Sequence, residues 1–304
     1  MRLFVTGASG WIGSAAVAEL LAHNHDVLGL ARSDASAAAI AAAGAEVRRG
    51  DVTDLAVLRA AATECDGVVH LAFRHDVAFS GDFDTAVASD YAAIETIGDA
   101  LAGTGKPLAI ASGLAGLRSR EIATEDDRPQ QTPGAGGRII NERIALALAE
   151  RGVRSMSVRF APTVHGAGDR GFIAVIVAAD REHGAAAYVG DGDNRWAAVH
   201  VTDAARLVRL GIERAPAGAV LHAAGEEGIP FRQIAEAIGR RLRLPTTSLP
   251  PEQAGEHFGF LGAFVTLDAP ASSAQTRELL GWEPAGPGLL ADITAGAYDP
   301  ALVA

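Results

Sequence analysis

Three glycines near the start of the chain, Gly7, Gly10 and Gly13, have the spacing of a phosphate-binding turn. They follow an apolar run at residues 3–6 and open a stretch in which Ala, Val and Leu recur with helical spacing. A turn between a strand and a helix lets the backbone approach a pyrophosphate, and the N–H groups at the helix start face its charge. Dinucleotide binding is therefore favoured over a purely structural glycine-rich turn.

The end of a second apolar run, at residues 26–31, indicates which dinucleotide binds. Proteins specific for NAD place a carboxylate here to accept a hydrogen bond from the ribose 2′-OH. This chain has Ala31, followed by Arg32 and Ser33. Without the acid a 2′-phosphate meets no repulsion, and a guanidinium offers it a fork of donors. We therefore expect NADP(H), the alternative being that Arg32 is only a solvated loop residue.

A candidate proton donor follows the apolar run at residues 67–72. His75 lies there between Phe73 and Asp76, in a loop of the kind that lines the crevice at the carboxyl ends of parallel strands. An imidazole titrates near neutrality, so His75 can act as a general acid. A histidine exposed in a surface loop is an equally weighted interpretation.

Apolar runs typical of buried strands alternate with helical stretches along the chain, and this pattern predicts an α/β fold with a doubly wound parallel sheet. The expected strands are residues 3–6, 26–31, 46–48, 67–72, 108–112 and 155–160. The expected helices are residues 14–23, 35–43, 54–61, 89–102 and 140–151.

The pattern loosens after about Gly166. We expect helices at residues 172–179, 202–214 and 231–242, a strand at 219–224, and a proline-rich break at 245–251. The chain is therefore divided into an NADP-binding Rossmann domain, residues 1–165, and a smaller C-terminal substrate-binding region, residues 166–304. The second region is expected to be partly interleaved with the first sheet.

With its G-x-x-G-x-x-G spacing, the chain resembles the extended short-chain dehydrogenase/reductase superfamily over nearly its whole length. The matching segments are residues 6–13, 50–52, 69–72, 159–166, 190–193 and 200–203. The resemblance implies a Rossmann fold and a contact between Asp51 and the adenine. The expected cofactor contacts are Gly7, Ser9, Gly10, Trp11, Ile12, Gly13, Arg32, Ser33, Asp51, Val52, Leu71, Ala72, Phe73, Arg138 and Pro162.

The usual catalytic pair of this superfamily, Tyr-x-x-x-Lys, is absent from the sequence. The only lysine, Lys106, lies in a loop before residues 108–112. By the resemblance, the lysine position falls on Arg138 and the tyrosine position on Gly134. Arg138 can bond ribose hydroxyls and place a positive charge beside the nicotinamide, whereas Gly134 transfers no proton. The resemblance is therefore to the atypical members of the superfamily.

Other groups have to supply the proton in such a protein. By the resemblance, His165 occupies a position commonly held by a tyrosine near the nicotinamide, and Ser112 lies near the usual serine position as a supporting group. A neutral, packed imidazole is an equally weighted interpretation of His165. The expected catalytic residues are Ser112, Arg138, His75 and His165, with bulk water as a further proton source.

The substrate side offers one basic and one apolar candidate surface. Arg195 and Trp196 precede the segment 200–203, and an arginine in this region holds phosphate in sugar-nucleotide relatives. Residues 257–264 alternate phenylalanines with glycines, as a pliable apolar wall would, although ordinary core packing is nearly as good an explanation. The expected substrate contacts are Phe73, His75, Tyr91, His165, Arg195, Trp196, His257, Phe258 and Phe260.

The favoured function is an NADPH-dependent oxidoreductase that acts on a small, fairly apolar carbonyl, imine or enone. The first alternative is an NADP(H)-binding sensor or partner-binding protein with little catalysis. The weaker alternative is a sugar-nucleotide epimerase or dehydratase, because Gly134 cannot supply the base that epimerisation needs.

The bulk composition restricts the partners. A net charge of −11 disfavours nucleic acid and anionic membrane surfaces, and no apolar run approaches the roughly 18 residues that span a bilayer. The chain reads as a strand from residue 3, which leaves no room for a signal peptide and predicts a cytoplasmic protein. We expect no metal site.

Packing predicts the state of a few further residues. A single cysteine, Cys65, excludes an internal disulfide and is expected in the core, as is His70 within its apolar strand.

The helices at 89–102 and 140–151 carry apolar positions on more than one face. One face must pack on the sheet, so the other is available to a second subunit, which predicts a homodimer.

Overall fold

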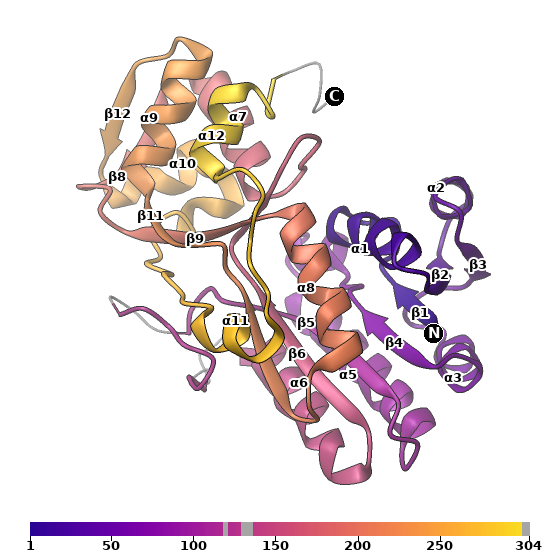
Figure 1. Cartoon of the computed structure of the whole chain (residues 1–304). Coiled ribbons are helices and arrows are strands. Elements are labelled where there is room, and N and C mark those ends of the chain that lie inside the picture. Colours follow the sequence, from indigo (N-terminus) through magenta and orange to yellow (C-terminus); the bar gives the residue numbers. More distant parts are fainter. Residues whose placement is uncertain (118–120, 129–135, 300–304) are drawn as a thin grey trace.

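The computed structural model describes residues 1–117, 121–128 and 136–299 and has two lobes (Figure 1). The larger lobe is built on a seven-stranded sheet with the order β10-β6-β5-β4-β1-β2-β3, in which every pairing is parallel. The strands are β1 (Arg2–Thr6), β2 (Asp26–Ala31), β3 (Glu46–Arg49), β4 (Gly67–His70), β5 (Pro107–Gly113), β6 (Arg154–Phe160) and β10 (Ala219–Ala223). This arrangement confirms the Rossmann-type α/β fold.

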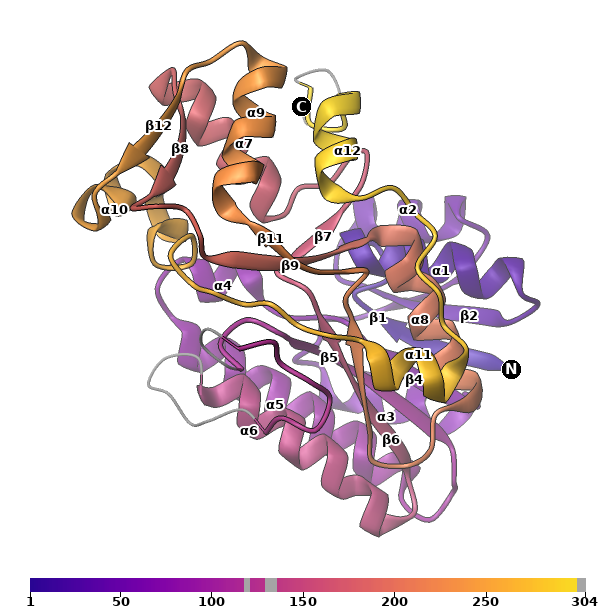
Figure 2. The same ribbon diagram turned by 60° about the vertical axis from the view of Figure 1, so that its left-hand side comes forward.

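Helices cover both faces of this sheet (Figures 1 and 2). They are α1 (Trp11–Ala22), α2 (Asp34–Ala42), α3 (Leu55–Glu64), α5 (Phe83–Leu101), α6 (Gly136–Ala147) and α8 (Val201–Arg214). Successive side chains of a strand point to opposite faces. Accordingly, Leu3 and Val5 join the core that includes α1 and α8, while Phe4 joins the core that includes α3, α5 and α6.

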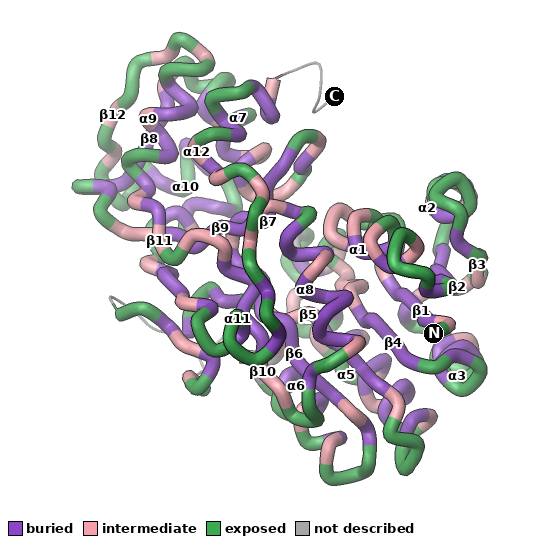
Figure 3. The backbone as a smooth tube through the Cα atoms, viewed as in Figure 1, coloured by how far each residue is buried: buried purple, intermediate pink, exposed green. Residues whose placement is uncertain are grey.

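The smaller lobe contains two short sheets and its own core (Figure 3). One sheet has the order β11-β9-β7, and the other pairs β12 with β8. Its strands are β7 (Thr163–His165), β8 (Ala186–Val189), β9 (Arg195–His200), β11 (Glu226–Pro230) and β12 (Thr246–Leu249). Its helices are α7 (Phe172–His183), α9 (Phe231–Leu242), α10 (Ala254–Phe258) and α12 (Leu289–Ala295), with the short 3-10 segments η2 (Pro251–Gln253) and η3 (Gly259–Ala263).

The chain returns from the smaller lobe to the larger one. Strand β10 pairs with β6 at the edge of the main sheet, and α8 packs against α1. Helix α11 (Ala274–Leu280) then packs near β10 before the chain rises again to α12 (Figures 1 and 2). Both lobes therefore depend on segments from the second half of the sequence.

Several expected element boundaries were wrong for identifiable reasons. Residues 245–251 are not simply a break, because they contain β12, which pairs in parallel with β8. Helix α1 begins at Trp11, directly after the glycine turn, and α5 begins at Phe83, where the carboxylate of Asp82 accepts a hydrogen bond from the N–H of Thr85. A short helix, α4 (His75–Phe79), lies where only a loop was expected.

Some smaller expectations are confirmed. Cys65 is fully buried, and burial raises the pKa of its thiol to about 11, so the side chain is a core group rather than a reactive thiol. Within the described ranges, no helix is long and apolar enough to cross a membrane.

Helix α6 is held to the sheet by a buried ion pair. The guanidinium of Arg159 on β6 donates to both carboxylate oxygens of Glu142, at 2.7 and 3.1 Å, and both residues are almost inaccessible to solvent. The hydroxyl of Ser157 donates to the same carboxylate at 2.6 Å. A further Arg159 nitrogen donates to the carbonyl of Asp127 at 2.9 Å. The pair therefore fixes how α6 sits along β6.

Replacing Glu142 with Ala should destabilise the protein by about 3–5 kcal/mol, because the Arg159 guanidinium would stay buried without its counter-ion. The measurement is the free energy of unfolding in urea. Glu150→Ala, an exposed glutamate in the 3-10 turn η1 (Leu148–Arg151) that follows α6, is the matched control and should change that value by less than about 0.5 kcal/mol. Similar losses for the two variants would contradict the role given to the pair.

Candidate cofactor and active site

The glycine turn after β1 has the geometry of a phosphate cradle. Gly7 adopts φ of +69°, and a Cβ at this position would lie 2.8 Å from the backbone nitrogen of Ala72. A Cβ on Gly13 would lie 1.9 Å from the carbonyl oxygen of Gly7. The N-cap of α1, Gly10, makes no side-chain hydrogen bond, and the first turn has no acidic residue. The first N–H groups of α1 are therefore left for an anion.

The turn is held to the end of β4 by a buried hydrogen-bonded chain. The backbone N–H of Ala72 donates to Thr6 Oγ1 at 3.2 Å, and Thr6 Oγ1 lies 2.8 Å from His70 Nδ1. On its other side, His70 Nε2 lies 3.1 Å from Asp90 on α5. The second Asp90 oxygen accepts a hydrogen bond of 2.7 Å from Asn141 on α6. His70 is thus a satisfied core group, as expected.

Asp90 is the charged residue in this series of hydrogen bonds. Burial opposes its ionisation, but the hydrogen bond from His70, the positive charge of Arg138 and the hydrogen bond from Asn141 together leave its pKa below the ordinary value. A carboxylate at Asp90 therefore remains charged and holds both the end of β4 and the start of α6. Neither Asp90 nor Asn141 was expected from the sequence, where each looks like an ordinary polar residue on a helix.

The adenosine end of the candidate site lies beyond β2. Ser33 is the N-cap of α2, and its hydroxyl accepts from the N–H of Ser36. The guanidinium of Arg49, at the end of β3, donates to the carbonyl of Ser33 at 2.5 Å and pairs with Asp34. Asp51 accepts from the N–H and hydroxyl of Thr53, at 3.0 and 2.8 Å. Arg49 is a second basic group here that sequence reasoning missed.

Arg32 also has a partner within the chain. Its guanidinium nitrogen Nη1 lies 3.0 Å from the Asp76 carboxylate, and the two side chains are 59% and 54% exposed. Asp76 lies in the first turn of α4, so this ion pair joins the end of β2 to the segment after β4. The sequence placed Asp76 beside His75 but did not indicate that it meets Arg32.

Several side chains contact Phe73 at the end of the candidate site where the nicotinamide is expected. The Arg138 guanidinium carbon lies 4.3 Å from the centre of the Phe73 ring, and Arg138 Nη2 donates to the carbonyl of Ala111 at 3.3 Å. The His75 ring meets Phe73 edge-on with 5.1 Å between ring centres, and Phe83 packs 6.0 Å from Phe73. Helix α6 and the segment after β4 thus bring Phe73, His75 and Arg138 together, beside the end of β5 that carries Ser112.

The positive charge of Arg138 opposes protonation of the neighbouring His75. Burial and then the positive charge of Arg138 lower the pKa of His75, with Asp76 acting in the opposite direction. Burial also lowers the pKa of Arg138, although Asp90 and Glu142 partly restore it. An arginine starts from so high a pKa that it stays charged at any working pH. The cluster therefore pairs a permanent cation with an imidazole that is mainly neutral.

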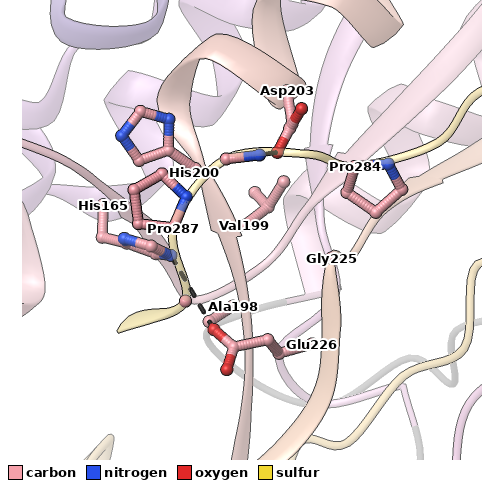
Figure 4. Close-up of a pocket in the computed structure, with 11 residues that line it drawn as sticks. His165, Ala198, Val199, His200, Asp203, Gly225, Glu226, Pro284 and Pro287 are labelled. Atoms are coloured by element: carbon pink, nitrogen blue, oxygen red, sulfur yellow. Dashed lines mark hydrogen bonds and ion pairs between the residues drawn. The ribbon is translucent and has the colours of Figure 1, made fainter. Parts of the chain in front are cut away.

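His165 belongs to a different environment (Figure 4). It is fully buried, its Nδ1 lies 2.7 Å from an Asp292 oxygen, and its Nε2 faces Glu226 at 3.9 Å. His165 and Glu226 line a cavity of about 130 Å³ whose wall also includes His200 and Asp203. Neither Phe73, Ser112, Arg138 nor Pro162 lines it. Burial, opposed by Asp292, lowers the His165 pKa.

Two of the expected substrate residues, Arg195 and Trp196, have partners within the protein. Arg195 is engaged by Asp268, with contacts of 2.8 and 3.1 Å, so its guanidinium fork already has a carboxylate partner. Trp196 is buried against Phe231, 5.1 Å between ring centres, in the core of the smaller lobe. Arg195 therefore forms an ion pair with Asp268, and Trp196 packs in the core of the smaller lobe.

The expected apolar wall at residues 257–264 is mostly core. His257 Nε2 lies 2.8 Å from Asp180, whose pKa burial raises to about 7, and Phe258 is 2% exposed. Only Phe260 of the named phenylalanines is largely exposed, at 47%. The wall was predicted from local composition, but α7, α9 and α10 bury its apolar side chains together.

Two helices next to the Phe73 cluster carry exposed apolar side chains. Tyr91 on α5 is 43% exposed and Ile140 on α6 is 42% exposed, so both leave apolar surface uncovered. The homodimer remains a prediction.

Gly134, the expected tyrosine position, lies outside the described residues.

Comparison with known proteins agrees with this architecture. Residues 3–225 match the NAD dependent epimerase/dehydratase family. An uncharacterized protein of Schizosaccharomyces pombe is 44% identical over 98% of this chain and 100% of its own length, and one of Saccharomyces cerevisiae is 43% identical over 97% and 98%. The dTDP-glucose 4,6-dehydratase of Streptomyces venezuelae, solved with NAD, has a TM-score of 0.78 at 21% identity and covers 98% of this chain and 96% of its own. The chain therefore belongs to the NAD dependent epimerase/dehydratase family.

Proposed function

We propose that this protein is an NADPH-dependent reductase of a small, fairly apolar substrate that carries a C=O, C=N or activated C=C bond. The observation that carries the proposal is the cluster of Phe73, His75 and Arg138 at the end of the sheet where the nicotinamide is expected. It combines an apolar surface, a titratable group and a fixed positive charge.

The residues present fit a bound dinucleotide. The uncapped start of α1 and the close approach of Gly7 to Ala72 suit a pyrophosphate, and Arg138 can bond the hydroxyls of the nicotinamide ribose. When bound, NADPH supplies a hydride to the substrate. The chain must then hold the substrate in line and offer a proton to the atom on which negative charge develops.

Within this proposal, His75 and Arg138 have separate roles. A protonated His75 donates the proton to the oxygen or nitrogen of a reduced C=O or C=N bond, or to the carbon next to the carbonyl when a C=C bond is reduced, and the neutral ring is reprotonated from solvent. Arg138 keeps its charge and stabilises the developing anion without transferring a proton. Phe73 and Phe83 favour an apolar substrate, and the engagement of Arg195 by Asp268 argues against a sugar nucleotide.

The test of the proposed activity uses purified protein and NADPH. Loss of NADPH absorbance should accompany addition of at least one member of a panel of apolar aldehydes, ketones, cyclic imines and enones. The matched control omits the protein. NADPH binding, seen by its fluorescence, with no oxidation across the whole panel would favour a cofactor sensor instead.

The 2′-phosphate should be recognised by Arg32, with Arg49 nearby, because the end of β2 lacks the acid that NAD-specific proteins use. Arg32→Ala should weaken NADPH binding by about 1–3 kcal/mol and leave NADH binding almost unchanged. Isothermal titration calorimetry measures both affinities. Arg59→Ala on α3, which removes an exposed arginine from another face, is the control. Equal affinity of the parent protein for the two cofactors would refute the assignment.

If His75 is the acid, activity requires its protonated form and should fall as pH rises. Since the His75 pKa is lowered, the midpoint should lie below the unperturbed value of about 6.5. His75→Gln should reduce kcat roughly 10²–10⁴-fold and remove that midpoint. His23→Gln, at the far end of α1, is the control. Full kcat and an unchanged pH profile in His75→Gln would exclude this role and direct attention to His165→Gln or to water.

A further inference from the structure

The carboxylate of Asp76 lies 3.0 Å from Arg32 Nη1, the side chain that the proposed function assigns to the 2′-phosphate. We propose that Asp76 is a specificity-determining residue, whose carboxylate competes with the 2′-phosphate for Arg32 and thereby limits the preference for NADPH over NADH. This inference rests on the proposed function, since it concerns the cofactor that the proposal assigns. It adds a residue that weakens the preference which Arg32 creates.

The ion pair spans the point where the dinucleotide is expected. In the main sheet, β1 lies between β4 and β2. Arg32 follows β2, and Asp76 lies in α4, after β4, so their 3.0 Å contact links the segments that follow the two neighbours of β1. A dinucleotide bound at this turn is expected to place its adenosine ribose, and a 2′-phosphate on it, near the ion pair of Arg32 and Asp76.

The charges around this end of β2 cancel. Arg32 pairs with Asp76, and Arg49 pairs with Asp34, whose side chain is 98% exposed. A phosphate dianion that approaches Arg32 therefore meets a cation whose charge is already balanced, with a carboxylate on the same guanidinium. Arg32 also holds the pKa of Asp76 below its usual range, so this carboxylate stays ionised at working pH.

The contact is one that a phosphate can replace. Both side chains are more than half exposed, so the ion pair itself contributes little stability and Arg32 can turn to another anion. The repulsion between Asp76 and the phosphate persists after the exchange, because the two anions remain near the same guanidinium. NADH has a neutral 2′-hydroxyl and does not meet this repulsion. The effect of Asp76 should therefore differ between the two cofactors.

The sharpest test is Asp76→Asn, which keeps the shape of the side chain and removes its charge. NADPH should bind about 5–20-fold more tightly at low ionic strength, as expected for a carboxylate and a phosphate dianion a few ångströms apart in a solvated site. NADH affinity should change less than about twofold, because its 2′-hydroxyl carries no charge. The gain for NADPH should shrink as salt is raised, since exposed charges are screened.

The adenosine halves of the cofactors give a readout that is independent of turnover. Calorimetry with 2′,5′-ADP and with 5′-AMP should show the same selective gain for the first ligand. Asp26→Asn, an exposed acid at the opposite end of β2, is the matched control for net charge and should leave both affinities unchanged. Relative to Arg32→Ala alone, the double variant Arg32→Ala/Asp76→Asn should show a much smaller gain, because neither variant has a guanidinium for which a carboxylate and the phosphate could compete.

Each outcome separates the inference from the function it rests on. A parent protein that prefers NADPH, together with an Asp76→Asn variant that is unchanged or gains equally for both cofactors, would overturn the inference alone. A parent and a variant that bind neither NADPH nor 2′,5′-ADP would overturn both. Circular dichroism of each variant confirms folding, and Asp76→Glu, which retains the charge, should behave as the parent.

Discussion

The position of helix α6 depends on a buried ion pair and a buried hydrogen bond to a carboxylate, and the candidate active site depends on α6. Glu142 is fixed to Arg159 on β6, and the neighbouring Asn141 is fixed to Asp90 on α5. A buried charge without a partner is costly, so neither contact tolerates a shift of the helix by a turn. Arg138 precedes these anchors by one turn and is therefore held over Phe73, beside the carbonyl of Ala111.

The buried contacts of Asp90 also connect α6 to the glycine turn. Asp90 links α6 through His70 and Thr6 to the backbone of Ala72, where β4 ends and the glycine turn passes closest. One continuous set of hydrogen bonds therefore sets the spacing between the phosphate-binding turn and Arg138. The chain has the scaffold of its family but no Tyr-x-x-x-Lys pair, and the candidate site instead brings together Arg138, Phe73 and His75.

The two histidines that look equivalent in the sequence differ because of what packs around them. His75 lies at the start of α4, against Phe73 and within the field of Arg138. His165 is fully buried, with an Asp292 oxygen from α12 at 2.7 Å from Nδ1, and its Nε2 faces Glu226, as Figure 4 shows. His165 lines a cavity that does not include Phe73, whereas the His75 ring contacts Phe73 directly. His75 is for this reason the acid in the proposed mechanism.

The sequence by itself determined the glycine turn, the strand and helix alternation, and the absence of a tyrosine and lysine pair, because these are properties of neighbouring residues. A tight turn needs Gly7 whatever the rest of the chain does, and the alternation of β1 side chains between the cores on the two faces follows from strand geometry. The contacts that give side chains their roles join distant segments: Arg32 to Asp76, Arg195 to Asp268 and His165 to Asp292. Only the tertiary structure decided those, since an ionisable side chain takes its role from the charge and burial that other elements bring to it.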